Sequence, residues 1–509
     1  MADEQAQGDG PIAAPPLDGG VAWLNVSRPL TWHDLRGKVV LLDFWTYGCV
    51  NCMHLLPDLR VLEERFASEL VIIGVHSPKF NNERATDNLR RILVRYEIEH
   101  PVINDAEMRI WRAYGARAWP TRVIVDPAGR LVGTATGEGN LQGFVQAIDT
   151  VIRVFEEGGA INREPLPLQL ERDRLADSPL LFPGKVLADP LSDRLYISDS
   201  NHNRIVIATK AGDVIDVVGS GLKGDADGIF SQARFYRPQG LALAAGTLYV
   251  ADTQNHQVRA IDLDARIVET VAGTGKQGAW GGDGGDATSV DLNSPWDLAL
   301  RPGILIIAMA GSHQIWVADL VNGQVYPYAG SGQEARQDGP VSDAAFAQPS
   351  GLALDGDTLY VADAESNLVR AVSLPPANEV TTLAGGDLFD FGHVDGDGAI
   401  ARFQHPLGIA VHAGMIYIAD TYNHRIRALD PVARRVTTLA GTGLSGLKDG
   451  AAGRAQFAEP GGLSAVGGQL FVADTNNHAI RQIELASGEV RTLTLNGLTP
   501  PGAYSYLRR

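Results

Sequence analysis

The chain has 509 residues, of which 45% are hydrophobic and 20% are charged, and its formal net charge is −17. A chain of this length exceeds what one hydrophobic core supports, so we expect two or more domains. The acidic balance argues against a protein that binds nucleic acid through clustered cations. No run of the sequence approaches the roughly 20 apolar residues of a membrane-spanning helix.

Residues 1–20 are acidic and rich in Gly and Pro, and they lack the basic and apolar stretches of a signal peptide. This composition predicts a flexible leader. The two cysteines of the chain, Cys49 and Cys52, are too few for a disulfide framework and are typical of a reducing compartment. We therefore expect a cytoplasmic protein.

The two cysteines lie between a predicted strand and a predicted helix. Residues 38–45 (KVVLLDFW) form an apolar run typical of a buried strand, and residues 51–66 have leucines at helical spacing. Cys49 is therefore expected at the start of a helix, where N–H groups favour the thiolate and can lower a cysteine pKa to between roughly 3.5 and 7.5. Cys49 is the candidate attacking thiol and Cys52 the resolving thiol. The alternatives are two inert buried thiols, or a metal site that, even with His54, falls short of the four ligands of zinc.

Further strands and helices alternate along the first part of the chain. We expect a strand at 69–77, a helix at 85–98, a strand and helix within 100–116, and two strands within 121–139. This order predicts a small mixed α/β sheet with a terminal hairpin, contained in a domain of residues 21–160.

This region resembles the thioredoxin superfamily, and within it the TlpA and DipZ-like branch. The resemblance lies in LRGKVVLLDFWTYGCVNC, GVHSPKF, HPVIND and WPTRVIVDPAGRLVG. It implies that Pro120 is a cis-proline that faces the dithiol and docks the partner peptide by its backbone edge, flanked by Trp119 and Thr121. It also implies that Asp43 is the buried carboxylate that moves the proton of the resolving cysteine. An ordinary strand residue at position 43 would face solvent, yet its neighbours are apolar.

Two residues depart from the family pattern. Gly48 stands where thioredoxins and TlpA proteins have a Trp before the first cysteine, and Asn51 stands where they have a Pro between the cysteines. Both lie on the surface that meets the substrate. Both also affect the balance between dithiol and disulfide, so the direction of the redox reaction stays open.

After a proline-bearing linker at 161–180, the sequence repeats itself six times. An Asp, replaced once by Met, recurs at intervals of 53 to 57 residues, at Asp199, Asp252, Met309, Asp363, Asp420 and Asp474. Each repeat reads as four short strands, which predicts a six-bladed β-propeller over 181–497 and a tail at 498–509. The motif resembles the NHL repeat. LPLQLE (166–171) alternates well enough to add an outer strand across the closing seam.

Four sets of side chains recur within the repeats. We expect the Asp residues to accept backbone N–H groups in the turn after the second strand. The histidines of that turn are interpreted as packing residues instead of metal ligands, and the arginines as struts between blades. The Asp-Gly turns lack the closely spaced oxygens of a calcium loop. The histidines are His202, His256, His313, His424 and His478, the arginines Arg259, Arg370, Arg427 and Arg481, and the turn aspartates Asp227, Asp338, Asp397 and Asp449.

The third repeat departs most from the others. Its preceding loop, 275–295, is rich in Gly but lacks the spacing of a phosphate-binding loop, so we interpret it as a rim loop. Trp280 in this loop is a candidate contact for a protein partner.

A thioredoxin-like module followed by an NHL propeller resembles the NHL-repeat-containing protein 2 family over nearly the whole chain. The leading functional hypothesis is a thiol–disulfide oxidoreductase, without cofactor or metal, whose propeller recruits a protein client and which a thioredoxin or glutathione system reduces. The second is a protein-interaction scaffold with a vestigial or redox-sensing dithiol. The third is a metal-dependent propeller lactonase or lyase, although the mostly apolar inner strands predict a plugged channel.

Overall fold

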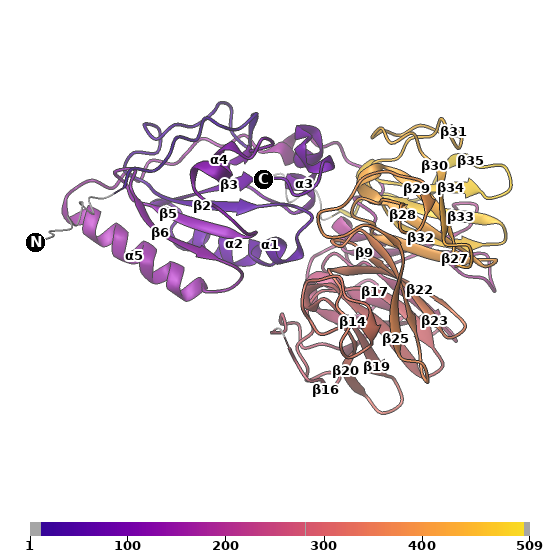
Figure 1. Ribbon diagram of the computed structural model, residues 1–509. Helices are drawn as coiled ribbons and strands as arrows, with labels where there is room; N and C mark the ends of the chain where they lie inside the picture. Colours follow the sequence, from indigo (N-terminus) through magenta and orange to yellow (C-terminus); the bar gives the residue numbers. More distant parts are fainter. Residues whose placement is uncertain (1–11, 280, 503–509) are drawn as a thin grey trace, which may run out of the picture. The chain divides into compact units, whose positions relative to one another are not determined.

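The computed structural model describes residues 12–279 and 281–502 (Figure 1). The chain forms two compact units, Met1–Ala176 and Asp177–Arg509. No helix in the described ranges is long and apolar enough to cross a membrane. Trp280, the predicted partner contact, lies outside the described residues.

The first unit is built on a six-stranded sheet in the order β1-β4-β3-β2-β5-β6. β2 and β4 run parallel to β3, and the other pairs are antiparallel. In Figure 1, α2 and α5 lie on one side of this sheet and α4 on the other. The strands are β1 (Ala22–Leu24), β2 (Val39–Trp45), β3 (Leu70–His76), β4 (Val102–Asn104), β5 (Thr121–Val125) and β6 (Leu131–Thr136). The helices are α1 (Val50–His54), α2 (Leu56–Arg65), η1 (Asn82–Arg84), α3 (Thr86–Arg95), α4 (Arg109–Ala113), α5 (Leu141–Glu157) and η2 (Glu171–Arg174).

These elements confirm the predicted α/β fold and refine its details. Every residue of β2 is buried, as the apolar run predicted. The helix expected at 51–66 is divided at Leu55 into α1 and α2, and Pro57, which has no N–H to donate, lies in the first turn of α2. Helix α5 was not predicted, although its apolar residues Phe144, Val145, Ile148 and Val151 face the core at helical spacing.

At both ends of the first unit the structure differs from what the sequence predicted. Part of the expected leader packs on the first unit, since Leu17 lies in the core and the N–H of Ala14 donates to the carbonyl of Gly129. Residues 166–171 form no strand and do not extend the propeller. Pro167 lacks an N–H donor for a β-ladder, and the N–H of Gln169 donates to the carbonyl of Asn25 within the first unit instead.

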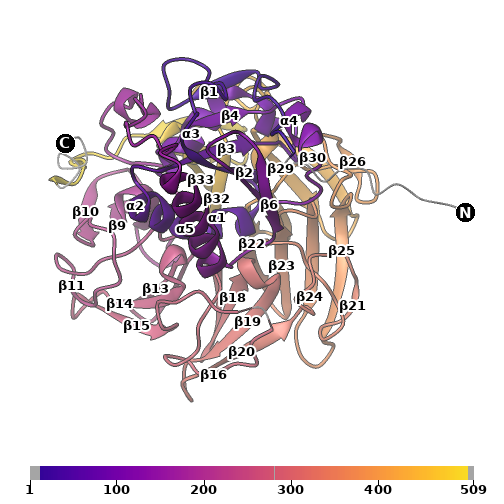
Figure 2. The ribbon, with the colours of Figure 1, turned by 90° about the vertical axis from the view of Figure 1, so that its left-hand side faces the viewer.

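The second unit is the predicted six-bladed propeller, and Figure 2 shows its blades following one another around a ring. Each blade is an antiparallel sheet of four strands, and blades two to six add a two-residue strand from the preceding loop. The first three blades are β7 (Val186–Ala188), β8 (Arg194–Asp199), β9 (Arg204–Thr209) and β10 (Val214–Val218); β12 (Leu241–Ala244), β13 (Thr247–Asp252), β14 (Gln257–Asp262) and β15 (Ile267–Ala272) with β11 (Gly228–Ile229); and β17 (Pro295–Arg301), β18 (Ile304–Met309), β19 (Gln314–Asp319) and β20 (Gln324–Ala329) with β16 (Gly285–Asp286).

The remaining blades repeat the same arrangement. They are β22 (Pro349–Asp355), β23 (Thr358–Asp363), β24 (Leu368–Ser373) and β25 (Glu379–Gly385) with β21 (Gly339–Pro340); β27 (Gly408–His412), β28 (Met415–Asp420), β29 (Arg425–Asp430) and β30 (Arg435–Ala440) with β26 (Gly396–Asp397); and β32 (Pro460–Val466), β33 (Gln469–Asp474), β34 (Ala479–Glu484) and β35 (Glu489–Leu493) with β31 (Gly450–Ala451).

A ring of six hydrogen bonds joins each blade to the next. One residue of each turn after the second strand has a positive φ, and its side chain accepts the N–H of a residue that leads into the inner strand of the following blade. We call this contact the blade latch. The six pairs are Asn203–Arg237, His256–Ser294, His313–Gln348, Asn367–His405, His424–Glu459 and His478–Phe182, at 2.9–3.0 Å.

The blade latches sharpen the interpretation of the histidines and close the seam. Four of the five histidines do more than pack, because their Nδ1 atoms accept the hydrogen bonds that join neighbouring blades. His202 was aligned one position out of register, and Asn203 is the latch of its blade. At the seam, His478 accepts from Phe182, and Asn496 pairs with Asp213 in a parallel bridge. The propeller therefore closes through its own first and last blades.

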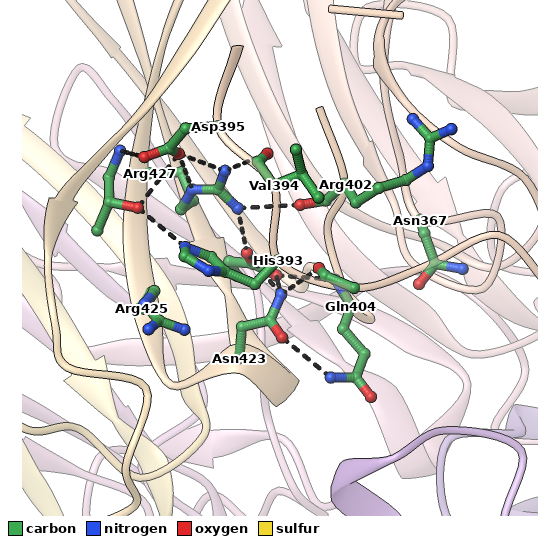
Figure 3. A network of polar contacts seen from close by, with 12 residues as sticks. Asn367, His393, Val394, Asp395, Arg402, Gln404, Asn423, Arg425 and Arg427 are labelled. Carbon is green, nitrogen blue, oxygen red and sulfur yellow. Dashed lines mark hydrogen bonds and ion pairs between the residues drawn. The ribbon is translucent and has the colours of Figure 1, made fainter. Parts of the chain in front are cut away.

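A buried network of Arg and two Asp residues lies inside each of four blades, and Figure 3 shows the one in blade five. Arg427 donates to Asp420 at 2.6 Å and to Asp395 at 2.6 Å, and its guanidinium lies over the ring of Phe403. All these residues belong to one blade, so the arginines are not struts between blades. The turn aspartate of this blade is Asp395 and not Asp397, and Asp420 accepts the N–H of Gln404 from the loop before the inner strand.

The third blade replaces this network with apolar side chains. Met309 takes the position of the repeat Asp, Trp316 that of the Arg, and Gly284 that of the turn Asp. Trp316 is buried and donates to Gln314 at 3.0 Å. Because the Arg and both Asp residues of the network are replaced together, none of them remains as a buried charge that has lost its partner. A single replacement would leave such a charge and destabilise the blade.

Candidate functional site

The dithiol follows the central strand of the first unit. β2 ends at Trp45, residues 46–48 form a turn, and Cys49 is the N-cap of α1, with its carbonyl accepting the N–H groups of Cys52 at 3.1 Å and Met53 at 3.3 Å. This is the predicted helix-start position, although α1 is five residues long.

The two cysteines are free and differ in burial, and both lie in the first unit. Cys49 is 8% exposed and Cys52 is 2% exposed. Burial, followed by a hydrogen bond to the Cys49 thiol, raises the pKa of Cys52 well above its ordinary value, and the charge of Asp43 adds to this shift. Cys52 is thus held as a thiol at neutral pH, which leaves Cys49 as the more accessible sulfur of a pair in contact.

Asp43 lies on β2, buried beneath the dithiol. Its cross-strand partners are Gly74 on β3 and Arg122 on β5. Its Oδ1 atom has no hydrogen-bond partner among the described residues, and burial raises the pKa of its carboxyl to about 6, against the opposing charges of His100 and Arg122. A carboxyl with this pKa can take up and release a proton near neutral pH.

Arg122 is a buried cation beside Asp43 that sequence reasoning missed. Its Nη2 donates to the carbonyls of Gly137 at 2.8 Å and Gly139 at 3.0 Å, and its guanidinium lies 4.3 Å from the centre of the Phe144 ring. An arginine within a strand otherwise rich in β-branched residues was the available signal, because such a strand buries its side chains on both faces.

Pro120 has the predicted cis peptide bond with Trp119 and is buried at the start of β5. Since Thr121 pairs with Phe44, the proline lies next to the end of β2, where the redox turn begins. Neither the main-chain N–H nor the carbonyl of Trp119 has a hydrogen-bond partner among the described residues. This free backbone edge is the kind that an extended peptide can pair with.

The side chains around Pro120 bind their own domain. The indole N–H of Trp119 donates to the carbonyl of Ser77 at 2.8 Å, and its ring lies 4.5 Å from that of Trp111. The hydroxyl of Thr121 donates to the carbonyl of Ala118 at 2.7 Å. Trp119 and Thr121 therefore shape this loop, and its backbone is what remains for a partner.

The two residues that depart from the family pattern differ in environment. Gly48 is buried, and its N–H donates to Glu83 at 2.8 Å, whereas Asn51 is partly exposed on the first turn of α1. Glu83 is a second residue that the sequence analysis missed. It follows the HSPKF motif closely, but nothing in its local pattern distinguishes it from a surface glutamate.

The centre of the propeller is closed at one level by a buried ion pair. Lys185 of the first blade donates to Asp297 of the third at 2.9 Å and to the carbonyls of Ser350 and Leu407. The equivalent positions of the other four blades are glycines, at Gly240, Gly351, Gly408 and Gly462. An added Cβ at each would lie 2.3–2.9 Å from a backbone atom of the next blade. We call this ring of Lys185, Asp297 and the four glycines the neck. The inner strands next to the neck line a cavity of about 390 Å³, mostly with apolar side chains.

Two family models match the chain. The model described as thioredoxin-like covers residues 37–131, and the NHL repeat model covers residues 235–261, 403–429 and 457–483. NHL repeat-containing protein 2 of Bos taurus is 42% identical over 94% of this chain and 71% of that protein. The chain is a member of the NHL repeat-containing protein 2 family.

Other relatives of this family member differ in how much they share with it. Protein SUPPRESSOR OF QUENCHING 1, chloroplastic, of Arabidopsis thaliana is 45% identical over 96% of the chain, which spans about half (48%) of that protein's length. Protein DipZ of Mycobacterium tuberculosis is 34% identical over 27% of the chain and 20% of its own length. The predicted combination of a thioredoxin-like domain and an NHL propeller is thereby confirmed.

Proposed function

We propose that this protein is a thiol–disulfide oxidoreductase whose propeller recruits a protein client. The observation that carries the proposal is the arrangement at the dithiol, where Cys49, the less buried of the two cysteines, contacts Cys52 above a carboxyl that titrates near neutral pH. Attacking thiol, resolving thiol and proton acceptor are the three parts that thiol–disulfide exchange requires.

The reaction proceeds in two exchanges. The Cys49 thiolate attacks one sulfur of a client disulfide, forms a mixed disulfide and releases the other client sulfur as a thiolate. Asp43 then accepts the Cys52 proton, and the Cys52 sulfur attacks Cys49, which forms the Cys49–Cys52 disulfide and releases the second client thiolate. Two electrons and two protons from a reduced thioredoxin or from glutathione regenerate the dithiol in a reducing, cytoplasmic environment.

The backbone beside Pro120 supports the docking step. The free N–H and carbonyl of Trp119 offer one rung of a β-ladder to an extended client segment next to the dithiol. Gly48, directly before Cys49, has no side chain, and Asn51, between the two cysteines, has a short one, so neither places a large side chain in that approach.

On the propeller, exposed apolar side chains of two neighbouring loops support a client surface. They precede the inner strands of blades five and six and comprise Phe389, Ile400, Leu444 and Leu447.

Two cysteine variants test the reaction. Reduced wild-type protein is expected to reduce the disulfides of insulin and Cys49→Ser is not; equal rates would contradict the proposal. In cells quenched with acid, Cys52→Ser is expected to accumulate mixed disulfides on Cys49, because the resolving thiol is missing. The double variant, which has no thiol, is the matched control.

A protein-interaction scaffold with a vestigial or redox-sensing dithiol is the second candidate. The 8% exposure of Cys49 favours it, because a client disulfide has little sulfur surface to reach. A dithiol whose potential lies far from that of cytosolic glutathione, and which never cycles in cells, would support the scaffold. A metal-dependent propeller enzyme is the weakest candidate, since its channel would need converging ligands where the neck has four glycines and one ion pair. Zinc or calcium in purified protein would revive it.

A further inference from the structure

Glu83 is a fully buried carboxylate that joins the two loops beside the dithiol. It lies in η1, and its side chain is 0% exposed. Its Oε1 accepts the N–H of Gly48 at 2.8 Å. Its Oε2 accepts the hydroxyl of Thr46 at 2.6 Å and the N–H groups of Lys79 at 2.7 Å and Phe80 at 2.8 Å. Two donors come from the turn before Cys49 and two from the loop after β3.

All four contacts of Glu83 are donors, so the ionised carboxylate fits the site and a neutral amide does not. A glutamine can place its oxygen toward only one side. If the oxygen meets the three donors on the Oε2 side, the amide NH₂ faces the N–H of Gly48, and that hydrogen bond is lost. Glu83→Gln therefore removes the charge and frees the Gly48 N–H with a minimal change of shape.

No lysine or arginine side chain pairs with Glu83 in the described part of the chain. His76, at the end of β3, stacks on Tyr47 of the same turn, and burial lowers its pKa to about 3, so that it is neutral. Burial raises the pKa of Glu83 itself, while its hydrogen bonds to Thr46, Phe80, Gly48 and Lys79 favour the charged form. Among the described residues, the negative charge behind the turn is thus balanced by hydrogen-bond dipoles.

We propose that Glu83 is a positioning residue that makes the dithiol a reductant. Its carboxylate holds Gly48, the residue before Cys49, and keeps that N–H from the Cys49 sulfur. Its negative charge also opposes a thiolate on Cys49, which exists only in the reduced state. Destabilisation of the reduced state favours the Cys49–Cys52 disulfide, so the dithiol gives up its two electrons more readily.

This inference rests on the proposed redox function, and one titration separates the two. The full-length protein is equilibrated with glutathione buffers of increasing disulfide content near pH 8, and the fraction of Cys49–Cys52 disulfide is measured after acid quenching. Glu83→Gln is expected to shift the equilibrium about tenfold toward the dithiol, the size of one hydrogen bond to a charged group. A tenfold change corresponds to about 30 mV.

Two further variants make the result decisive. Thr46→Val removes a donor that favours the ionised form of Glu83, so its pKa rises further and a smaller fraction of the carboxyl is charged. The Gly48 bond stays, so we expect a smaller shift in the same direction even if Glu83→Gln fails to fold. Glu64→Gln, at an exposed position of α2, is the matched control and should leave the equilibrium unchanged. An unchanged or more reducing potential in folded Glu83→Gln, or no shift in Thr46→Val, would overturn the inference alone. A wild-type protein that forms no Cys49–Cys52 disulfide would overturn both the inference and the proposed function.

Discussion

Replacement of Asp43 by Asn is expected to stabilise the first unit in a pH-dependent way while it slows the proposed reaction. The carboxyl is buried, and its pKa is about 6 in the folded protein against 3.8 in an unfolded chain. The folded state therefore binds the proton more tightly, and the free energy of unfolding falls as pH rises through this range. The loss reaches about 3 kcal/mol above pH 6, from about 1.4 kcal/mol per pKa unit.

Asp43→Asn removes this loss, because an amide does not ionise. We expect its gain in stability to grow from about 1 kcal/mol near pH 4.5 to about 3 kcal/mol near pH 8. Both cysteines lie in the first unit, so the rate at which Cys52 is labelled at increasing guanidinium concentration, with a thiol reagent that works in acid, reports on this unit alone. Asp18→Asn, at an exposed position, is the control. A gain that does not change with pH would refute the reasoning, as would an undiminished rate of mixed-disulfide resolution.

Three other changes test the packing of the two units. Burial lowers the pKa of His76 to about 3, so as the pH falls the unfolded chain takes up a proton at this histidine before the folded chain does. The free energy of unfolding should therefore fall below about pH 6.5, by up to about 1.4 kcal/mol per pH unit. His76→Phe should abolish this pH dependence in the same labelling assay. His478→Ala should cost about 1–3 kcal/mol by leaving a buried N–H without its acceptor, whereas His478→Asn, which copies the latches of blades one and four, should retain the melting temperature. Arg427→Met should lower the free energy of unfolding by about 3–5 kcal/mol, because it leaves Asp420 and Asp395 without their ion pair. A triple variant with the blade-three residues at positions 395, 420 and 427 should recover most of this loss in thermal unfolding. No recovery would show that the apolar arrangement depends on the rest of blade three.

The six repeats show where prediction from sequence succeeded and where it stopped. The period of the motif gave the number of blades, and the Asp and Gly residues of the turns gave four strands in each. The partners of the repeated side chains could not be predicted, because a repeat in the sequence does not show whether a contact lies within one blade or between two blades. The arginines, expected between blades, bind within one, and the histidines form the links between blades.

At the dithiol, the local pattern and the family resemblance led to Cys49, Cys52, Asp43 and Pro120. A buried strand that runs into a helix start is a short-range feature, so its residues are neighbours in both sequence and space. Helix α5 was missed because no chemical motif drew attention to it, although its amphipathic spacing was present. The linker segment 166–171 was misassigned because its alternation resembles a strand, while Pro167 deprives it of an N–H group that a ladder needs.

The sequence by itself determined the two folds, the number of blades and the position of the dithiol, since these follow from periodicity and from residues within one turn of each other. Tertiary structure alone decided the surroundings of the dithiol. Glu83 meets Gly48 across 35 residues, and Arg122 comes beside Asp43 through the pairing of two strands far apart in the chain. Such contacts depend on how the sheet and its loops pack, because burial brings together side chains whose own sequence neighbours carry no trace of the partner.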